Sequence, residues 1–143
     1  MADFYAATWN NPLHMSEDGR GSGDAFVYQN TTGAPIAIAD RIFLGKIAGG
    51  TWVHRGLLKA ITAIAACTVN IGFEARESNS AAGTATSFLT AASLATAGAT
   101  VESGFEPFRT EGDIAVFATV AGAAIPVNAK LAFIWSGISV GRL

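Results

Sequence analysis

The chain has 143 residues, of which 50% are hydrophobic and 14% charged, with 16 glycines and a formal net charge of -2. This length suits one domain with a single core, and the composition excludes both intrinsic disorder and an all-helical bundle. The nearly balanced charge also argues against wrapping nucleic acid or coating an anionic membrane, so we expect neither as a partner.

The single cysteine, Cys67, excludes an intrachain disulfide and clusters of thiolate metal ligands. The first residues, MADFYAATWNN, lack the basic start and continuous apolar core of a signal peptide. No stretch is apolar for long enough to cross a bilayer as a helix. We therefore expect a protein made in a cytoplasm, without bound metal or cofactor.

Residues 1–33 differ from the rest of the chain. The segment NNPLHMSEDGRGSGD is polar and rich in glycine, without repeated apolar spacing, which is typical of an irregular arm. Within it, DAFVYQN predicts a short strand and NTTGAP a turn. We predict an extended, interacting N-terminal arm over 1–33 and a body over 34–143.

From residue 34 onward the hydrophobic period is mostly two, which predicts strands. A first strand, IAIADRIFLGKI, places Ile36, Ile38, Ile42 and Leu44 on one apolar face. The charged residue Asp40 interrupts this face. TWVHRG predicts the next strand. CTVNIGFEARE alternates most cleanly, with a core face made by Cys67, Val69, Ile71 and Phe73.

The segment TATSFLTAASLATAG has apolar residues at helical spacing, with Thr86 or Ser87 as a cap and Gly98 as a terminator. It predicts one short helix. Strands resume in DIAVFATV and KLAFIWSGISV, which AGAAIPVNA joins as a loop. The sequence thus predicts an all-β fold, an antiparallel β-sandwich or jelly-roll-like body with one short helix and an irregular N-terminal arm.

The window DRIFLGKIAGGTWVHRG contains glycines, a lysine and a threonine, as phosphate-binding loops do. In those loops the lysine follows the second glycine and a helix begins there. Here Lys46 precedes Gly49 and Gly50, and the residues after them favour a strand. We predict a tight turn between strands.

Candidate reacting groups lack partners at useful spacing. His14 and His54 are the only histidines, and Cys67 falls on an apolar strand face without a nucleophile-elbow sequence. Glu102, Glu106 and Glu111 lie around a loop, where solvated acids are usual. We predict no catalytic site and do not expect an enzyme.

The segment HMSEDGRGSGD has some features of a calcium loop, because Asp18, Ser22 and Asp24 offer oxygen ligands separated by glycines. Arg20 stands where a second carboxylate is expected, and no glutamate closes the ring. We therefore predict no metal site.

The tryptophans are the remaining candidates for contacts. Trp135 lies in LAFIW and predicts core packing, whereas Trp9 stands in a polar arm with no local core to join. Trp9 is therefore predicted to insert into a neighbouring subunit. The predicted contact residues are Phe4, Tyr5, Trp9, His54 and Arg55.

The order of ADRIFLGKIAGGTWVHRG, TVNIGFEA, TSFLTAASLATAG, DIAVFATVAGAAIP and KLAFIWSGISVG resembles tailed-bacteriophage head decoration (cement) proteins and related small virion structural proteins. The resemblance covers Ile36 to Gly141 and is one of pattern and order. It implies a β-sandwich or jelly-roll-like body on the outer capsid surface, often as a trimer. It supplies no catalytic residues.

We therefore expect a structural virion protein of a tailed phage that binds the major capsid protein and itself, as a homotrimer, and stabilises the head. Its location would be the capsid surface, after synthesis in the host cytoplasm. Two alternatives stay open: a carbohydrate-binding module on a virion or tail that uses Trp52 and His54, and a tail or head-completion protein.

Overall fold

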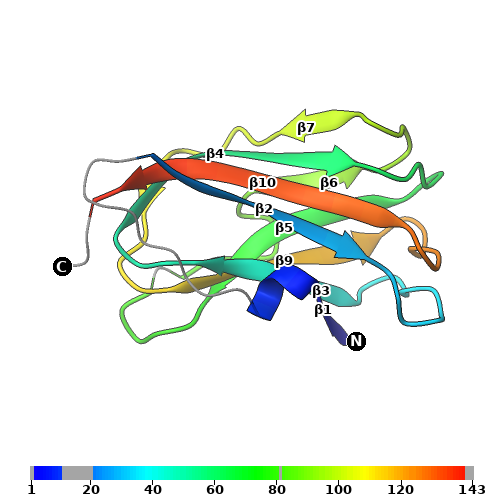
Figure 1. Cartoon of the computed structure of the whole chain (residues 1–143), viewed down its shortest axis with the longest axis horizontal. Coiled ribbons are helices and arrows are strands. Elements are labelled where there is room, and N and C mark those ends of the chain that lie inside the picture. The colour runs from blue at the N-terminus through cyan, green and yellow to red at the C-terminus, as the bar shows by residue number, and fades with distance from the viewer. Residues whose placement is uncertain (1, 11–20, 81, 141–143) are drawn as a thin grey trace.

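The computed structural model describes residues 2–10, 21–80 and 82–140, which form two stacked β-sheets (Figure 1). A 3-10 turn, η1 (Ala7–Asn10), follows the first strand. The strands are β1 (Asp3–Tyr5), β2 (Gly21–Gln29), β3 (Arg41–Ile47), β4 (Thr51–Ala60), β5 (Thr68–Ala75), β6 (Leu89–Ser93), β7 (Thr100–Glu102), β8 (Phe108–Arg109), β9 (Ile114–Ala121) and β10 (Lys130–Ser139).

The strand order is that of a jelly roll. Sheet A runs β1-β3-β9-β5-β6 and sheet B runs β2-β10-β4-β7, with β8 beside β4. Apart from β1 and β8, four strands in each sheet follow the jelly-roll connectivity, in which consecutive strands pass between the sheets except at β5 and β6, which are neighbours in sheet A. These strands pair antiparallel, and among the described strands only β1 pairs parallel, with β3. The predicted all-β sandwich is confirmed.

The core lies between the sheets and follows the period of two. The predicted core face of β5 and of the residue just before it is buried: Cys67, Val69, Ile71 and Phe73. Alternate residues of β9 and β10 meet them from the other strands: Ile114, Val116, Ala118, Val120, Leu131, Phe133 and Trp135. Removing this apolar surface from water supplies the main driving force for the fold.

The predicted helix in TATSFLTAASLATAG is wrong, because this segment forms a turn and then β6. Ser87 donates its backbone N–H to the carbonyl of Thr84, and the Ser87 hydroxyl accepts from the Thr84 amide. Such local side-chain bonds compete with a helix. Ala92 then pairs with Val69 of β5, so sheet pairing outweighs the helical spacing.

The strand predicted from Ile36 begins later, at Arg41. Ala39 has a φ of 74°, and a carboxylate oxygen of Asp40 accepts from the amide of Ala37 at 3.1 Å. These features close a turn, so Asp40 precedes the strand instead of interrupting it. Ile36 remains as an isolated bridge to Ile125.

Part of the segment predicted as an arm, residues 1–33, belongs to the sheets, and the division at residue 33 stays a prediction. β1 pairs with β3, and β2 pairs along its length with β10. Phe26 and Tyr28 alternate into the core, and β2 overlaps the short strand predicted for DAFVYQN. Residues 11–20 lie outside the described residues.

The turn predicted at Gly49 and Gly50 is confirmed and joins β3 to β4. Gly50 has a φ of 81°, a conformation that favours glycine. A Cβ atom on Gly49 would lie 2.7 Å from the carbonyl oxygen of Glu111. The glycines therefore allow the turn to pass close to the backbone at Glu111, and the strand β4 follows them instead of a helix.

Candidate interaction surfaces

The outer face of sheet B, the face turned away from sheet A, carries exposed apolar side chains. Trp52 of β4 is 43% exposed, and Ile138 of β10 lies opposite it and is 40% exposed. Their pairing joins two large apolar groups across neighbouring strands. Together they form the centre of an open apolar patch at this end of the sheet.

The apolar surface continues toward β2. Val27 is 40% exposed and pairs with Ala132, while Ile134 lies between Ala25 and Leu57 in the register. The face therefore presents apolar side chains from three adjacent strands. Ser136 of β10, paired with Arg55, lies between Ile138 and Ile134, so a polar position separates the two apolar groups on this face. Exposed apolar groups gathered on one face mark interaction sites more often than single exposed residues do.

Charged groups border this face on the β4 and β7 side. The Nε of Arg55 donates to a carboxylate oxygen of Glu102 at 2.8 Å, and both side chains are more than half exposed. Lys59 is exposed on the same strand. An apolar centre with a charged rim is the usual composition of a protein interface.

A bulge explains why two neighbouring predicted residues are both exposed. Ser136 pairs with Arg55 whereas Gly137 pairs with Val53, so His54 is the extra residue in β4. Bulges redirect side chains in this way. The structure thus places His54 and Arg55 on the border of the face that holds Trp52.

The outer face of sheet A has aromatic residues too, but the chain covers them itself. Phe43 of β3 and Phe117 of β9 pair in register and are buried. The Phe43 ring lies 5.3 Å from Tyr5 and 5.2 Å from Trp9, measured between centroids. β1 and η1 hold these covering side chains across the sheet.

Cations surround this aromatic cluster, which consists of Tyr5, Trp9, Phe43 and Phe117. The Lys46 ammonium lies 4.9 Å and the Arg76 guanidinium 5.2 Å from the Trp9 ring centroid. The expectation that Trp9 lacks a local core was wrong, because Trp9 packs on the buried cluster of its own chain. The rings meet in space although β1, β3 and β9 are far apart in sequence.

Arg41 ties the covering strand to sheet A. Its guanidinium lies over the Phe43 ring at 4.9 Å and forms ion pairs with Asp3 at 3.0 Å and Glu74 at 3.4 Å. The hydrogen bond to Asp3 raises the pKa of Arg41 above its ordinary value. This side chain therefore stays charged and links β1 to β3 and β5.

The five predicted contact residues fall into two separate groups. Phe4 packs against the main core, Tyr5 is 55% exposed beside the covered cluster, and Trp9 is half-buried. His54 and Arg55 lie on the other sheet. The structure therefore does not join all five into one surface, and their contact role remains a prediction.

Sequence reasoning missed Ile138 and Val27 as surface residues. The apolar run KLAFIWSGISV did signal that β10 is apolar on both faces. A strand that is apolar on both faces has one face for the core and another for something else. That signal, combined with the strand order, identifies the outer face of sheet B.

Within the described residues no group of three or more His, Cys, Asp and Glu side chains could hold a metal ion. Cys67 is fully buried, and burial raises the pKa of its thiol. His14 and Asp18 lie outside the described residues. Over the described ranges, no helix is long and apolar enough to span a membrane.

No protein-family model matches the chain, and no curated protein matches it in sequence. A chain from the capsid of Ralstonia phage GP4 has the same fold, with a TM-score of 0.73 and 16% identity over 99% of this chain and 100% of that one. A chain of the cyanophage Pam1 capsid asymmetric unit has a TM-score of 0.60 and 21% identity over 92% and 93% of the two chains. At these identities the likeness shows a shared fold.

Proposed function

We propose that this chain is a structural virion protein of a tailed phage, a decoration protein that binds the outer surface of the capsid and stabilises the head. The observation that carries the proposal is the nearly full-length likeness to chains from two phage capsids. The partners would be the major capsid protein and further copies of the chain, as a homotrimer. The role is one of contact and involves no reaction.

The outer face of sheet B supplies a surface suited to this role. Its centre, with Trp52 and Ile138, is apolar and open, and its rim carries the exposed Arg55–Glu102 pair. Aromatic side chains at the centre of an interface contribute most of its binding energy, and the rim excludes water. We therefore assign capsid binding to this face.

The test uses capsids assembled without this chain, mixed with the purified protein and then sedimented. Wild-type protein is expected to bind at a saturating ratio of many copies per capsid and to raise the melting temperature of the capsid. Trp52→Ala is expected to weaken binding by about tenfold to a hundredfold, as loss of an interface anchor does.

Ile61→Ala is the matched control, because Ile61 is 39% exposed but lies in a turn after β4. It should bind as the wild type does. Absence of the chain from purified virions, or no binding to the bare capsids, would refute the decoration role. Equal binding by both variants would move the contact away from sheet B.

A carbohydrate-binding role has one observation in its favour. Trp52 is 43% exposed and His54 is exposed on the same strand, and an open indole can stack on a sugar ring. Glycan-array binding that Trp52→Ala abolishes, with the fold intact, would favour this role over decoration. Few copies per particle would favour a tail or head-completion component instead.

A further inference from the structure

The edge of sheet B formed by β2 has no neighbouring strand within the described residues. β2 pairs with β10 on one side and ends the sheet order on the other. Its sequence, GSGDAFVYQ, contains neither lysine nor proline, the residues that commonly protect an edge. An unpaired edge of this length offers a template for another strand.

The alternation of the ladder shows which backbone groups are free. At the end of β2, the Asn30 amide donates to the carbonyl of Ala129 at 3.0 Å. In an antiparallel pair every second residue bonds to the partner strand, and the residues between them point their N–H and C=O groups away. The residues of β2 that point to the open edge are therefore Ala25, Val27 and Gln29.

A local bond supports this assignment. The Ala25 amide donates to a carboxylate oxygen of Asp24 at 2.8 Å, as expected of an N–H group that does not point toward β10. The Asp24 carboxylate thus satisfies an edge N–H group at this end of β2, which disfavours pairing with another strand there. Toward the other end of β2, the amides of Val27 and Gln29 point to the open edge, and both residues line a groove.

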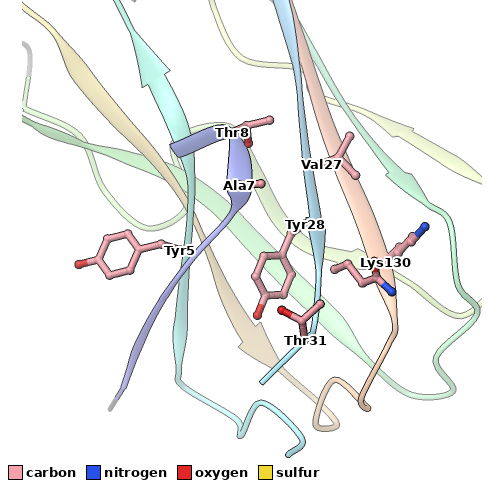
Figure 2. Close-up of a pocket in the computed structure, with 8 residues that line it drawn as sticks. Tyr5, Ala7, Thr8, Val27, Tyr28, Thr31 and Lys130 are labelled. Carbon is pink, nitrogen blue, oxygen red and sulfur yellow. The ribbon is translucent and has the colours of Figure 1, made fainter. Parts of the chain in front are cut away.

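A groove of about 360 Å³ runs along this part of the edge. Figure 2 shows β1 and η1 on one side of it and β2 on the other, with the Tyr28 side chain between them. Its lining residues are Tyr5, Ala7, Thr8, Val27, Tyr28, Gln29, Thr31 and Lys130. The volume falls within the range of sites that hold small ligands, so several side chains of a bound peptide fit.

The chemistry of the groove favours an acidic side chain. Lys130, which is exposed, is the one charged residue among the described residues that line the groove, and none of them is acidic. Burial raises the pKa of Tyr28, so its phenol stays neutral and can donate a hydrogen bond. Figure 2 shows the Tyr28 ring turned toward the groove, where it supplies an apolar wall.

The remaining edge strands are less suited to pairing. β7 and β1 have three residues each, and β1 is held by the Asp3–Arg41 ion pair. In β6, Ala91 has a φ of 50° and its amide donates to the side chain of Asn70. Short or bulged edges resist addition of a strand.

We propose that the free edge of β2 binds an extended segment of a partner polypeptide as an added strand, with an acidic side chain of that segment beside Lys130. Main-chain hydrogen bonds to Val27 and Gln29 would supply affinity, and the groove would supply preference for particular side chains. For the source of the segment, a capsid protein, we rely on the proposed function. The edge site itself does not depend on it.

The experiment selects binders from a phage-displayed library of random peptides against the full-length chain. Selected peptides are expected to alternate β-branched residues and to carry an acidic residue. Val27→Pro should lower their affinity by roughly tenfold or more, because proline removes the N–H that the added strand needs. Val127→Ala, which truncates a similarly exposed valine that does not line the groove, should bind as the wild type does.

Two further measurements keep the test decisive. In the wild type, bound peptide should slow amide hydrogen exchange at Val27 and Gln29, and Lys130→Glu should select basic peptides instead of acidic ones. Enrichment of no peptide, unchanged exchange at both amides, or equal binding to Val27→Pro would overturn the proposal. A change in the oligomeric state of the chain alone on Val27→Pro would overturn it in favour of pairing between copies. Failure to bind capsids, by contrast, would refute only the decoration role.

Discussion

The two outer faces of the sandwich both carry large apolar and aromatic side chains, but only one face is covered by other described parts of the chain. On sheet A, Phe43 and Phe117 are buried beneath Tyr5 and Trp9. On sheet B, Trp52 and Ile138 remain about two-fifths exposed, and no described segment covers them. The difference teaches that apolar residues outside the core serve folding on one face and remain available for association on the other.

The covering of sheet A has a recognisable physical cost and gain. Ordering β1 and η1 costs about 1–2 kcal/mol of backbone entropy per residue. Ring burial in the aromatic cluster, the Arg41 ion pairs and the cations over Trp9 offset that cost. Sheet B has no such covering within the described residues, so its apolar area can lower the free energy only when a partner arrives.

The largest effect should come from Phe43→Ala, which removes the ring at the centre of the covered cluster. Loss of a buried phenylalanine leaves a cavity and lowers the free energy of unfolding by about 3–5 kcal/mol. Trp52→Ala on the open face should change it by less than about 1 kcal/mol. Denaturant unfolding of both variants measures the contrast, and equal losses would show that the open face also stabilises the monomer.

Sequence patterns predicted most of the fold because alternation reports directly on burial. The core face of β5 and the glycine turn at Gly49 were readable from neighbouring residues alone. The segment that became β6 was not, because its helical spacing lost to pairing with Val69 of β5. Pairing partners are distant in sequence, and a single chain does not reveal them.

The candidate surfaces could be predicted from the sequence only in part, because the residues that meet on them are also distant in sequence. The sequence showed that Trp9 was isolated in a polar segment, yet Phe43 and Phe117 lie elsewhere in the chain. His54 and Arg55 were noticed as a pair, but the bulge opposite Ser136 and Gly137 that exposes both depends on register. Alternation gives a strand two faces and says nothing of what covers them.

The loop that contains Thr84 and Ala85 packs against Gly72 of β5 and so covers another part of sheet A. A Cβ on Gly72 would overlap the carbonyl oxygen of Thr84 and lie 2.8 Å from the Cα of Ala85. Gly72→Ala should therefore lower the free energy of unfolding by about 1–3 kcal/mol, as overpacking does. Gly104→Ala is the matched control, because nothing lies within 4 Å of its added Cβ. Similar melting temperatures for both variants would show that the loop is not packed against β5.

Arg41 is expected to contribute more to the free energy of unfolding than an ordinary surface arginine does. Arg41→Ala removes two ion pairs and a cation over the Phe43 ring, so a loss of about 1–2 kcal/mol is expected. Arg41→Lys should recover part of it, since an ammonium cannot hold Asp3 through two nitrogens. Thermal unfolding at low and high salt gives the measurement. An Arg41→Ala variant as stable as the wild type would mean that the aromatic contacts alone hold β1 in place.

The smallest effect on folding should come from Arg55→Ala, at the rim of the open face. Its ion pair with Glu102 is exposed at both ends, and such pairs contribute less than about 1 kcal/mol. If this face binds a capsid, the same change should instead alter the association rate and its salt dependence, because rim charges steer encounters. Stopped-flow binding to bare capsids at two salt concentrations separates these effects. A variant that loses stability without any change in association would reverse the assignment of the two faces, because the rim of sheet B would then serve the fold.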